Sequence, residues 1–153
     1  MKFTKVLIIL SVLFFSYALW FSFRETIIVG VHKEGDAAYI LVKNPPLLDS
    51  TKLKWWKEKS KYINENYHIP VNSRYGFILI MDYGKGYQLL PSDKRLSSVY
   101  PSDYICFDDM KTRINCLYKN WIMSISNKAD GELNIKIKKN SYTLKKDGSV
   151  VED

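Results

Sequence analysis

The sequence predicts an α+β protein: an N-terminal transmembrane helix followed by an antiparallel β-sheet domain with one principal amphipathic helix. Three observations support this fold class. Residues 6–23 form an uncharged apolar run, residues 49–67 have helical periodicity, and short β-rich runs separated by turn residues occupy most of the remainder. The predicted division is therefore an N-terminus at 1–5, a membrane helix at 6–23 and one folded domain at 24–153.

The run Val6–Phe23 contains eighteen residues without a charge, Gly or Pro. As an α-helix rising about 1.5 Å per residue it would span roughly 27 Å, close to the ~30 Å hydrocarbon core of a bilayer. We expect an uncleaved signal-anchor, because the one small-x-small sequence, Ser16-Tyr17-Ala18, lies inside the apolar run rather than after it. A cleaved signal peptide and a buried helix of a soluble protein stay open as alternatives.

The flanking charges predict an orientation. Lys2 and Lys5 precede the run, whereas Arg24 follows it and is directly followed by Glu25. Because positive charge is retained in the cytoplasm, we expect a cytoplasmic N-terminus and a folded domain on the outer side of the membrane.

The two cysteines, Cys106 and Cys116, predict a disulfide. A single pair in a small domain outside the cytoplasm usually forms one, and the loop-entropy estimate for so short a loop is about 3 kcal/mol. The alternative is two unrelated buried thiols. A zinc site is not expected, because His32 and His68 do not have the spacing of zinc ligands.

The β-rich runs of the domain are expected to form hairpins, because Gly, Asn and Asp turns separate most of them. The first hairpin follows the membrane helix directly, and an almost continuously apolar run in the middle of the chain is expected to be a central strand. The expected hairpins are 26–32 with 37–43, 75–82 with 87–90, and 121–126 with 132–138. The segments 103–107 and 116–118 are expected to flank the disulfide, and 141–144 is expected to be a further strand.

The principal helix has an apolar stripe and a lysine-rich opposite side. The stripe consists of Leu53, Trp56, Ser60, Ile63 and Tyr67, and the lysines are Lys52, Lys54, Lys59 and Lys61. We expect this helix to cover the sheet, with attachment to a membrane surface as the alternative. Trp55 lies about 100° around the helix from Trp56 and is expected at the edge of the stripe. There it could either anchor a partner or cover the rim of the sheet.

Paired carboxylates are the most distinctive polar feature. Asp108 and Asp109 could bind a cation, but no calcium-loop motif surrounds them, so we expect them to accept backbone amide bonds in a tight turn. No nucleophile, phosphate loop or metalloprotease motif is recognisable, and we expect neither an enzyme nor a cofactor. The formal net charge of +7 is compatible with anionic lipids, an acidic protein or simple solubility. Nucleic acid is not expected outside the cytoplasm.

Several motifs together resemble a known family. They are Val31-His32, Leu41-Val42-Lys43-Asn44-Pro45-Pro46, Trp55-Trp56, Tyr67-His68-Ile69-Pro70, Asp82-Tyr83-Gly84-Lys85-Gly86-Tyr87, and Cys106-Phe107-Asp108-Asp109-Met110-Lys111 with Cys116. The chain is similar over its whole length to the enterobacterial membrane-anchored family catalogued as domain of unknown function 943. The resemblance implies no activity and no ligand. It does imply an enterobacterial cell, in which the outer side of the inner membrane is the periplasm.

These features favour a non-catalytic, membrane-anchored periplasmic binding protein. Our leading hypothesis is an immunity protein that neutralises a toxin acting in the periplasm or at the inner membrane. The residues that we expect to contact a protein partner are Lys54, Trp55, Asp93, Lys94 and Arg95. The alternatives are an accessory or sensor subunit of an inner-membrane complex and a periplasmic module that binds lipid or a cation. Neither the oligomeric state nor the partner follows from the sequence.

Overall fold

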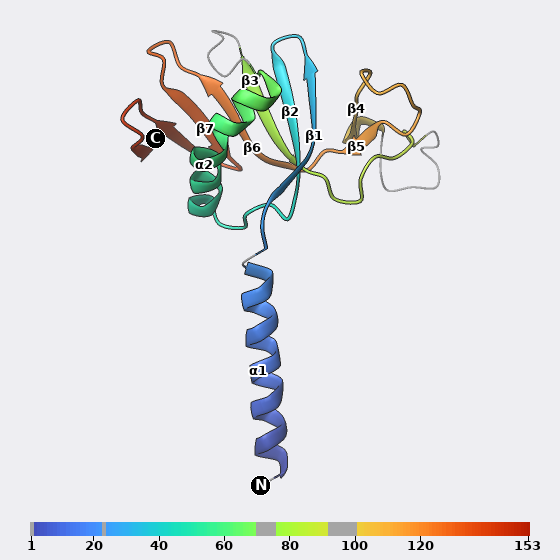
Figure 1. The fold of residues 1–153 in the computed structure, drawn as a ribbon, viewed down its shortest axis with the longest axis vertical. Coiled ribbons are helices and arrows are strands. Elements are labelled where there is room, and N and C mark those ends of the chain that lie inside the picture. Colours follow the sequence, from blue (N-terminus) through green and yellow to red (C-terminus); the bar gives the residue numbers. More distant parts are fainter. Residues whose placement is uncertain (1, 23, 70–75, 92–100) are drawn as a thin grey trace.

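The structure, a computed structural model, describes residues 2–22, 24–69, 76–91 and 101–153 (Figure 1). Its helices are α1 (Lys2–Ser22), α2 (Asp49–Tyr67) and the short 3₁₀ helix η1 (Pro101–Asp103). The strands are β1 (Ile27–Glu34), β2 (Ala37–Lys43), β3 (Phe77–Asp82), β4 (Tyr104–Cys106), β5 (Cys116–Tyr118), β6 (Trp121–Asn127), β7 (Leu133–Ile137), β8 (Asn140–Leu144) and β9 (Val150–Glu152).

Seven strands form one mixed sheet in the order β1-β2-β3-β6-β7-β8-β9. The prediction of an antiparallel sheet is wrong at one place, because β2 and β3 are parallel, with Ala37 opposite Phe77 and Val42 opposite Asp82. The physical reason is the connection between them: α2 carries the chain back along the sheet, and a helical crossover joins strands that run in the same direction. The predicted hairpins β1–β2 and β6–β7 are confirmed.

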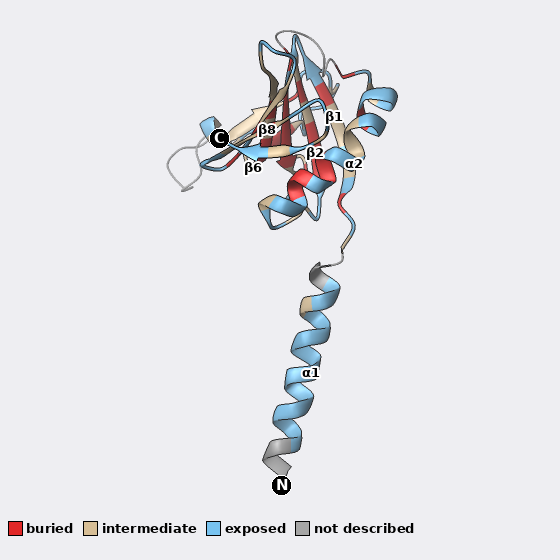
Figure 2. Cartoon of the chain, turned by 90° about the vertical axis from the view of Figure 1, so that its left-hand side faces the viewer, coloured by how far each residue is buried: buried red, intermediate tan, exposed pale blue. Residues whose placement is uncertain are grey.

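The helix α1 projects away from the sheet, and nearly all of its described side chains are exposed (Figures 1 and 2). The prediction of a transmembrane helix at 6–23 is wrong, since the described part of the chain contains no helix that is both long enough and apolar enough to cross a membrane.

The helix α2 covers one face of the sheet, as expected from its apolar stripe. Alternate residues of the central strands face it, and the buried indole of Trp56 lies in this core. Other buried side chains of this core are those of Ala38, Ile40, Val42, Leu53, Ile63, Ile78, Ile80, Met123, Ile125 and Ile135. Lys52, expected on the solvent side, is instead buried beside Asp49, and its Nζ lies 3.0 Å from the carboxylate.

The opposite face of the sheet carries a second, smaller unit, which we call the disulfide lobe (residues 101–119). It consists of η1, the two-stranded sheet of β4 and β5 and the loop between those strands. Phe107 and Leu117 of the lobe pack against Leu41 and Met81 of the large sheet and form a separate apolar cluster. The central strands are therefore covered on both faces.

The second predicted hairpin, 75–82 with 87–90, does not form. The turn after β3 exists, with the Gly86 amide 2.7 Å from the Tyr83 carbonyl oxygen, but Gln88 then pairs with Cys116 of the disulfide lobe. Strand β3 already pairs with β2 and β6, so neither of its edges can accept the returning chain. This segment consequently links the large sheet to the lobe.

Candidate functional site

The predicted disulfide is confirmed and closes the disulfide lobe. Cys106 and Cys116 lie directly opposite each other in the β4–β5 pair, with an S–S distance of 2.00 Å. Their antiparallel register also places Tyr104 opposite Tyr118, and the two rings meet edge to face with centroids 5.7 Å apart. The disulfide thus fixes a pair of tyrosines on the surface of the lobe.

The residues that were expected to contact a partner differ in their exposure. The Lys54 side chain is exposed, 3.8 Å from Glu58, and stays a candidate contact. Trp55 is only 8% exposed, because its ring packs with the core under the helix. It therefore covers the sheet, one of the two expected roles, and the expectation that it is an exposed partner contact is wrong. Asp93, Lys94 and Arg95 lie outside the described residues.

The two neighbouring aspartates have different environments. Both residues are exposed, and the carboxylate of Asp109 reaches Nδ1 of His32, with its two oxygens at 2.8 and 2.9 Å. A backbone hydrogen bond closes the turn at these aspartates, since the Met110 amide donates to the Phe107 carbonyl oxygen at 3.2 Å. That the carboxylates accept backbone amide bonds stays a prediction. Among the described residues, no three His, Cys, Asp or Glu side chains are grouped as a metal site would require.

His32 lies at the centre of a polar network between strand β1 and the disulfide lobe. Its Nε2 is 2.7 Å from the hydroxyl of Tyr87, and its ring stacks on Phe107 with centroids 3.9 Å apart. Gly30, two residues earlier, leaves room for this hydroxyl, because a Cβ there would lie 2.8 Å from it. In the arrangement that satisfies every group, Nδ1–H donates to Asp109 and the Tyr87 hydroxyl donates to Nε2.

The electrostatics of this network favour a structural role. Burial raises the pKa of Tyr87, and the nearby Tyr83 and Asp109 raise it further. The phenol therefore stays protonated at neutral pH and is a poor nucleophile, although the order of Asp, His and hydroxyl resembles that of hydrolases. His32 attaches the disulfide lobe to strand β1 through its contact with Asp109, and this structural role is the one that the arrangement supports.

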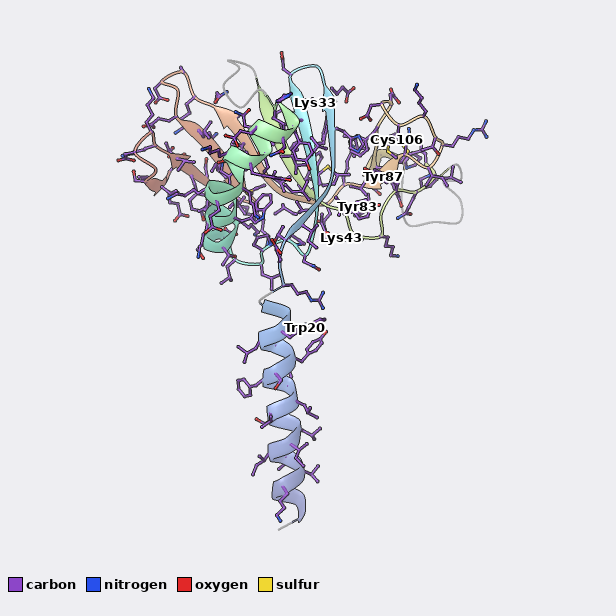
Figure 3. All side chains as sticks on the ribbon, in the orientation of Figure 1. Trp20, Lys33, Lys43, Tyr83, Tyr87 and Cys106 are labelled. Carbon is purple, nitrogen blue, oxygen red and sulfur yellow. A yellow bond between two sulfur atoms is a disulfide. The ribbon has the colours of Figure 1, made fainter. Side chains whose placement is uncertain are left out.

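A hollow of about 350 Å³ lies beside this network, where the turn after β3 meets the disulfide lobe. We call it the tyrosine hollow, because Tyr83, Tyr104 and Tyr118 line it together with the buried Leu117. Figure 3 shows Tyr83 and Tyr87 between the strands β1 and β2 and the lobe, close to Cys106. The other side chains around the hollow are Asp82, Lys85, Gln88 and Asn120.

The polar side chains of the hollow are held in place. Asp82 accepts a bond from the Gly84 amide at 3.0 Å and another from the side-chain amide of Asn120 at 3.2 Å. The ammonium of Lys43 lies 5.3 Å from the centre of the Tyr83 ring, within cation–π distance. A mixed lining of aromatic faces and positioned polar groups is typical of recognition sites.

Exposed apolar residues lie on the two segments that extend from the Gln88–Cys116 pairing. The Gln88–Cys116 pairing is antiparallel, which brings Leu90 towards Ile114 across the two segments. Leu90 and Ile114 are 46% and 52% exposed, and Tyr118 is 50% exposed. Exposed aromatic side chains such as Tyr118 are typical of protein–protein interfaces.

A second, wider depression of about 1150 Å³ lies at the end of the domain that faces α1. Its lining includes basic, acidic and apolar side chains without the aromatic pairs of the tyrosine hollow; Trp55 is one of the lining residues. We therefore regard the tyrosine hollow as the candidate functional site.

Most of this site was not predicted from the sequence. The pairing of Tyr104 with Tyr118 could have been predicted from the disulfide. When two cysteines lie opposite each other in antiparallel strands, the residue two positions before the first cysteine lies opposite the residue two positions after the second. His32 and Asp109 lie 77 residues apart, and no spacing rule connects them.

Comparison with known proteins agrees with the resemblance noted from the motifs. The family described as "Enterobacterial putative membrane protein (DUF943)" matches residues 1–153. No curated protein and no solved structure is significantly similar to the chain.

Proposed function

The chain belongs to this enterobacterial membrane-protein family, and from that premise we propose that it is a non-catalytic binding protein of the cell envelope that recognises a protein partner through the tyrosine hollow. The observation that carries the proposal is the pairing of Tyr104 and Tyr118 in the disulfide-closed strands, where both line the tyrosine hollow and Tyr118 is half exposed. Tyrosine supplies a large, rigid contact area and a hydroxyl at little cost in side-chain entropy.

The disulfide supports a periplasmic location for this domain. The covalent bond persists in oxidising compartments and is rare in the cytosol. A periplasmic binding domain can meet partners that enter the envelope from outside as well as partners that reside there. Such a location is compatible with a family of membrane proteins.

The specific form that we propose is an immunity protein, which binds and neutralises a toxin acting in the periplasm or at the inner membrane. A toxin is neutralised by covering its active surface, a task that needs a rigid recognition surface and no reaction centre. The tyrosine hollow provides such a surface, because the disulfide and the His32 network hold its walls.

The test is protection. A strain that lacks the chain should become sensitive to a toxin encoded near its gene, and the full chain should restore resistance. Tyr118→Ala should lose this protection while the protein stays folded, because the ring is half exposed. Tyr62→Ala is the matched control, since Tyr62 is similarly exposed on α2, away from the hollow. Full resistance of the deletion strain to every nearby toxin would contradict the proposal.

The exposed apolar surface of α1 favours one second candidate, an accessory subunit that binds a larger envelope complex through this helix. Apolar surface of this extent is normally covered by a partner or by lipid. Replacing residues 6–23 by an unrelated apolar helix separates the two proposals. An immunity protein should still protect, whereas an accessory subunit should lose its function.

A further inference from the structure

The loop between β2 and α2 (residues 44–48) lies at the end of the domain to which α1 is connected. Figures 1 and 2 both show α1 leaving from this side, and Figure 3 shows Lys43 on the side of Trp20 with Lys33 at the opposite end. The loop carries two adjacent apolar side chains: Leu47 is 64% and Leu48 66% exposed. Neither leucine contributes to the core that α2 covers.

The loop is stiff and close to the helix. Pro45 and Pro46 fix two backbone angles directly before the leucines. The chain from Ser22 at the end of α1 to Ile27 at the start of β1 covers five residue steps, at most about 18 Å when fully extended. The leucines are consequently held near the end of α1.

Charged side chains line the depression beside the two leucines; the basic ones are Arg24, Lys43, Lys54 and Lys59, and the acidic ones are Glu25, Glu58 and Asp82. The guanidinium of Arg24 lies 4.3 Å from the centre of the Trp20 ring. The loop is attached to this cluster, because Arg24 donates to the side-chain oxygen of Asn44 at 3.4 Å. Basic side chains outnumber acidic ones by four to three in this lining, and two exposed leucines with a basic excess and an aromatic ring match the chemistry of an anionic lipid surface.

We propose that residues 44–48 form a membrane-contacting loop: Leu47 and Leu48 enter the interfacial layer of an anionic lipid surface, and Arg24, Lys43 and Lys54 face the headgroup phosphates. This inference rests on the envelope location in the proposed function, but not on the tyrosine hollow. The contact holds the domain in one orientation, with the disulfide lobe to one side of the loop. It also accounts for the exposure of Leu47 and Leu48, which the fold leaves uncovered.

The experiment uses the full chain with its disulfide intact, reconstituted in vesicles that contain phosphatidylglycerol. Both cysteines are oxidised, so an added cysteine is a unique thiol for a fluorophore. Labelled Leu47→Cys should lose fluorescence when the vesicles carry nitroxide lipids, whereas labelled Lys33→Cys at the far end should not. Equal quenching at both positions, or none at position 47, would overturn the proposal.

A second measurement tests the charges. In the labelled Leu47→Cys protein, the added substitutions Lys43→Glu and Lys54→Glu should abolish most of the quenching, because like charge repels the loop from the anionic surface. Unchanged quenching would overturn the role given to these lysines. Both readouts use lipid alone, so a failure of partner recognition through the tyrosine hollow would leave them unaffected.

Discussion

The large sheet and the disulfide lobe are stabilised in different ways. The sheet is covered by α2 and holds a continuous apolar core around Trp56. The lobe has two three-residue strands and a small apolar cluster, and it depends on the Cys106–Cys116 bond and the contact of Asp109 with His32. The difference shows how a segment too small for a core of its own can still present a defined surface.

This division places the candidate site where the two regions meet. Tyr83 comes from the turn after β3, whereas Tyr104 and Tyr118 come from the lobe. The shape of the tyrosine hollow consequently depends on how firmly the lobe is attached. Perturbing each region separately should reveal which contacts control the site.

The largest effect is expected from the core of the large sheet. Trp56→Ala removes a fully buried indole and should lower the free energy of unfolding by about 3–5 kcal/mol. Chemical denaturation of the purified full chain measures it. Lys54→Ala, on the same helix but exposed, is the control and should change stability little. Similar losses in both variants would mean that α2 does not cover the core as described.

Removing the disulfide should affect mainly the lobe. The double variant Cys106→Ser/Cys116→Ser loses a loop constraint worth about 3 kcal/mol in the chain-entropy model. Amide hydrogen exchange should show faster exchange in β4 and β5, with β3 and β6 still protected. Uniform loss of protection through the large sheet would show that the two regions fold as one unit.

A smaller effect is expected from the polar attachment of the lobe. His32→Ala leaves the partly buried Tyr87 hydroxyl without its His32 partner and should cost about 1–3 kcal/mol. Gly30→Ala should act in the same direction, since its Cβ would displace that hydroxyl. Binding of a partner at the hollow should weaken in both variants. Wild-type stability of His32→Ala would refute the role assigned to this network.

The smallest effect is expected from the polar contact at the start of α2. A hydrogen bond from Lys52 is the largest cause that lowers the pKa of Asp49 from its ordinary 3.8, with smaller contributions from Asn140 and Tyr142. Because the folded pKa is the lower one, Asp49 stabilises the protein above pH 3.8, and this contribution is lost as the pH falls through the lowered value. Asp49→Asn should flatten the acid part of a stability–pH profile, and an unchanged acid slope would exclude this contribution.

Local patterns predicted much of the fold. The β1–β2 and β6–β7 hairpins, α2 and the disulfide all follow from turn residues, periodicity or spacing within short segments. The direction of β3 relative to β2 and the pairing of Gln88 with Cys116 were missed, because they depend on which sheet edges other strands already occupy. The membrane-spanning prediction for 6–23 was wrong as well.

The sequence by itself determined most of the helices and strands, the cysteine pair and the family, because each is encoded in neighbouring residues or in motifs along the chain. Only the tertiary structure decided that Trp55 is buried, that Asp109 meets His32 and that three tyrosines share one hollow. The physical reason is that these contacts join residues far apart in the chain. Their proximity arises only when α2 and the disulfide lobe cover opposite faces of the same sheet.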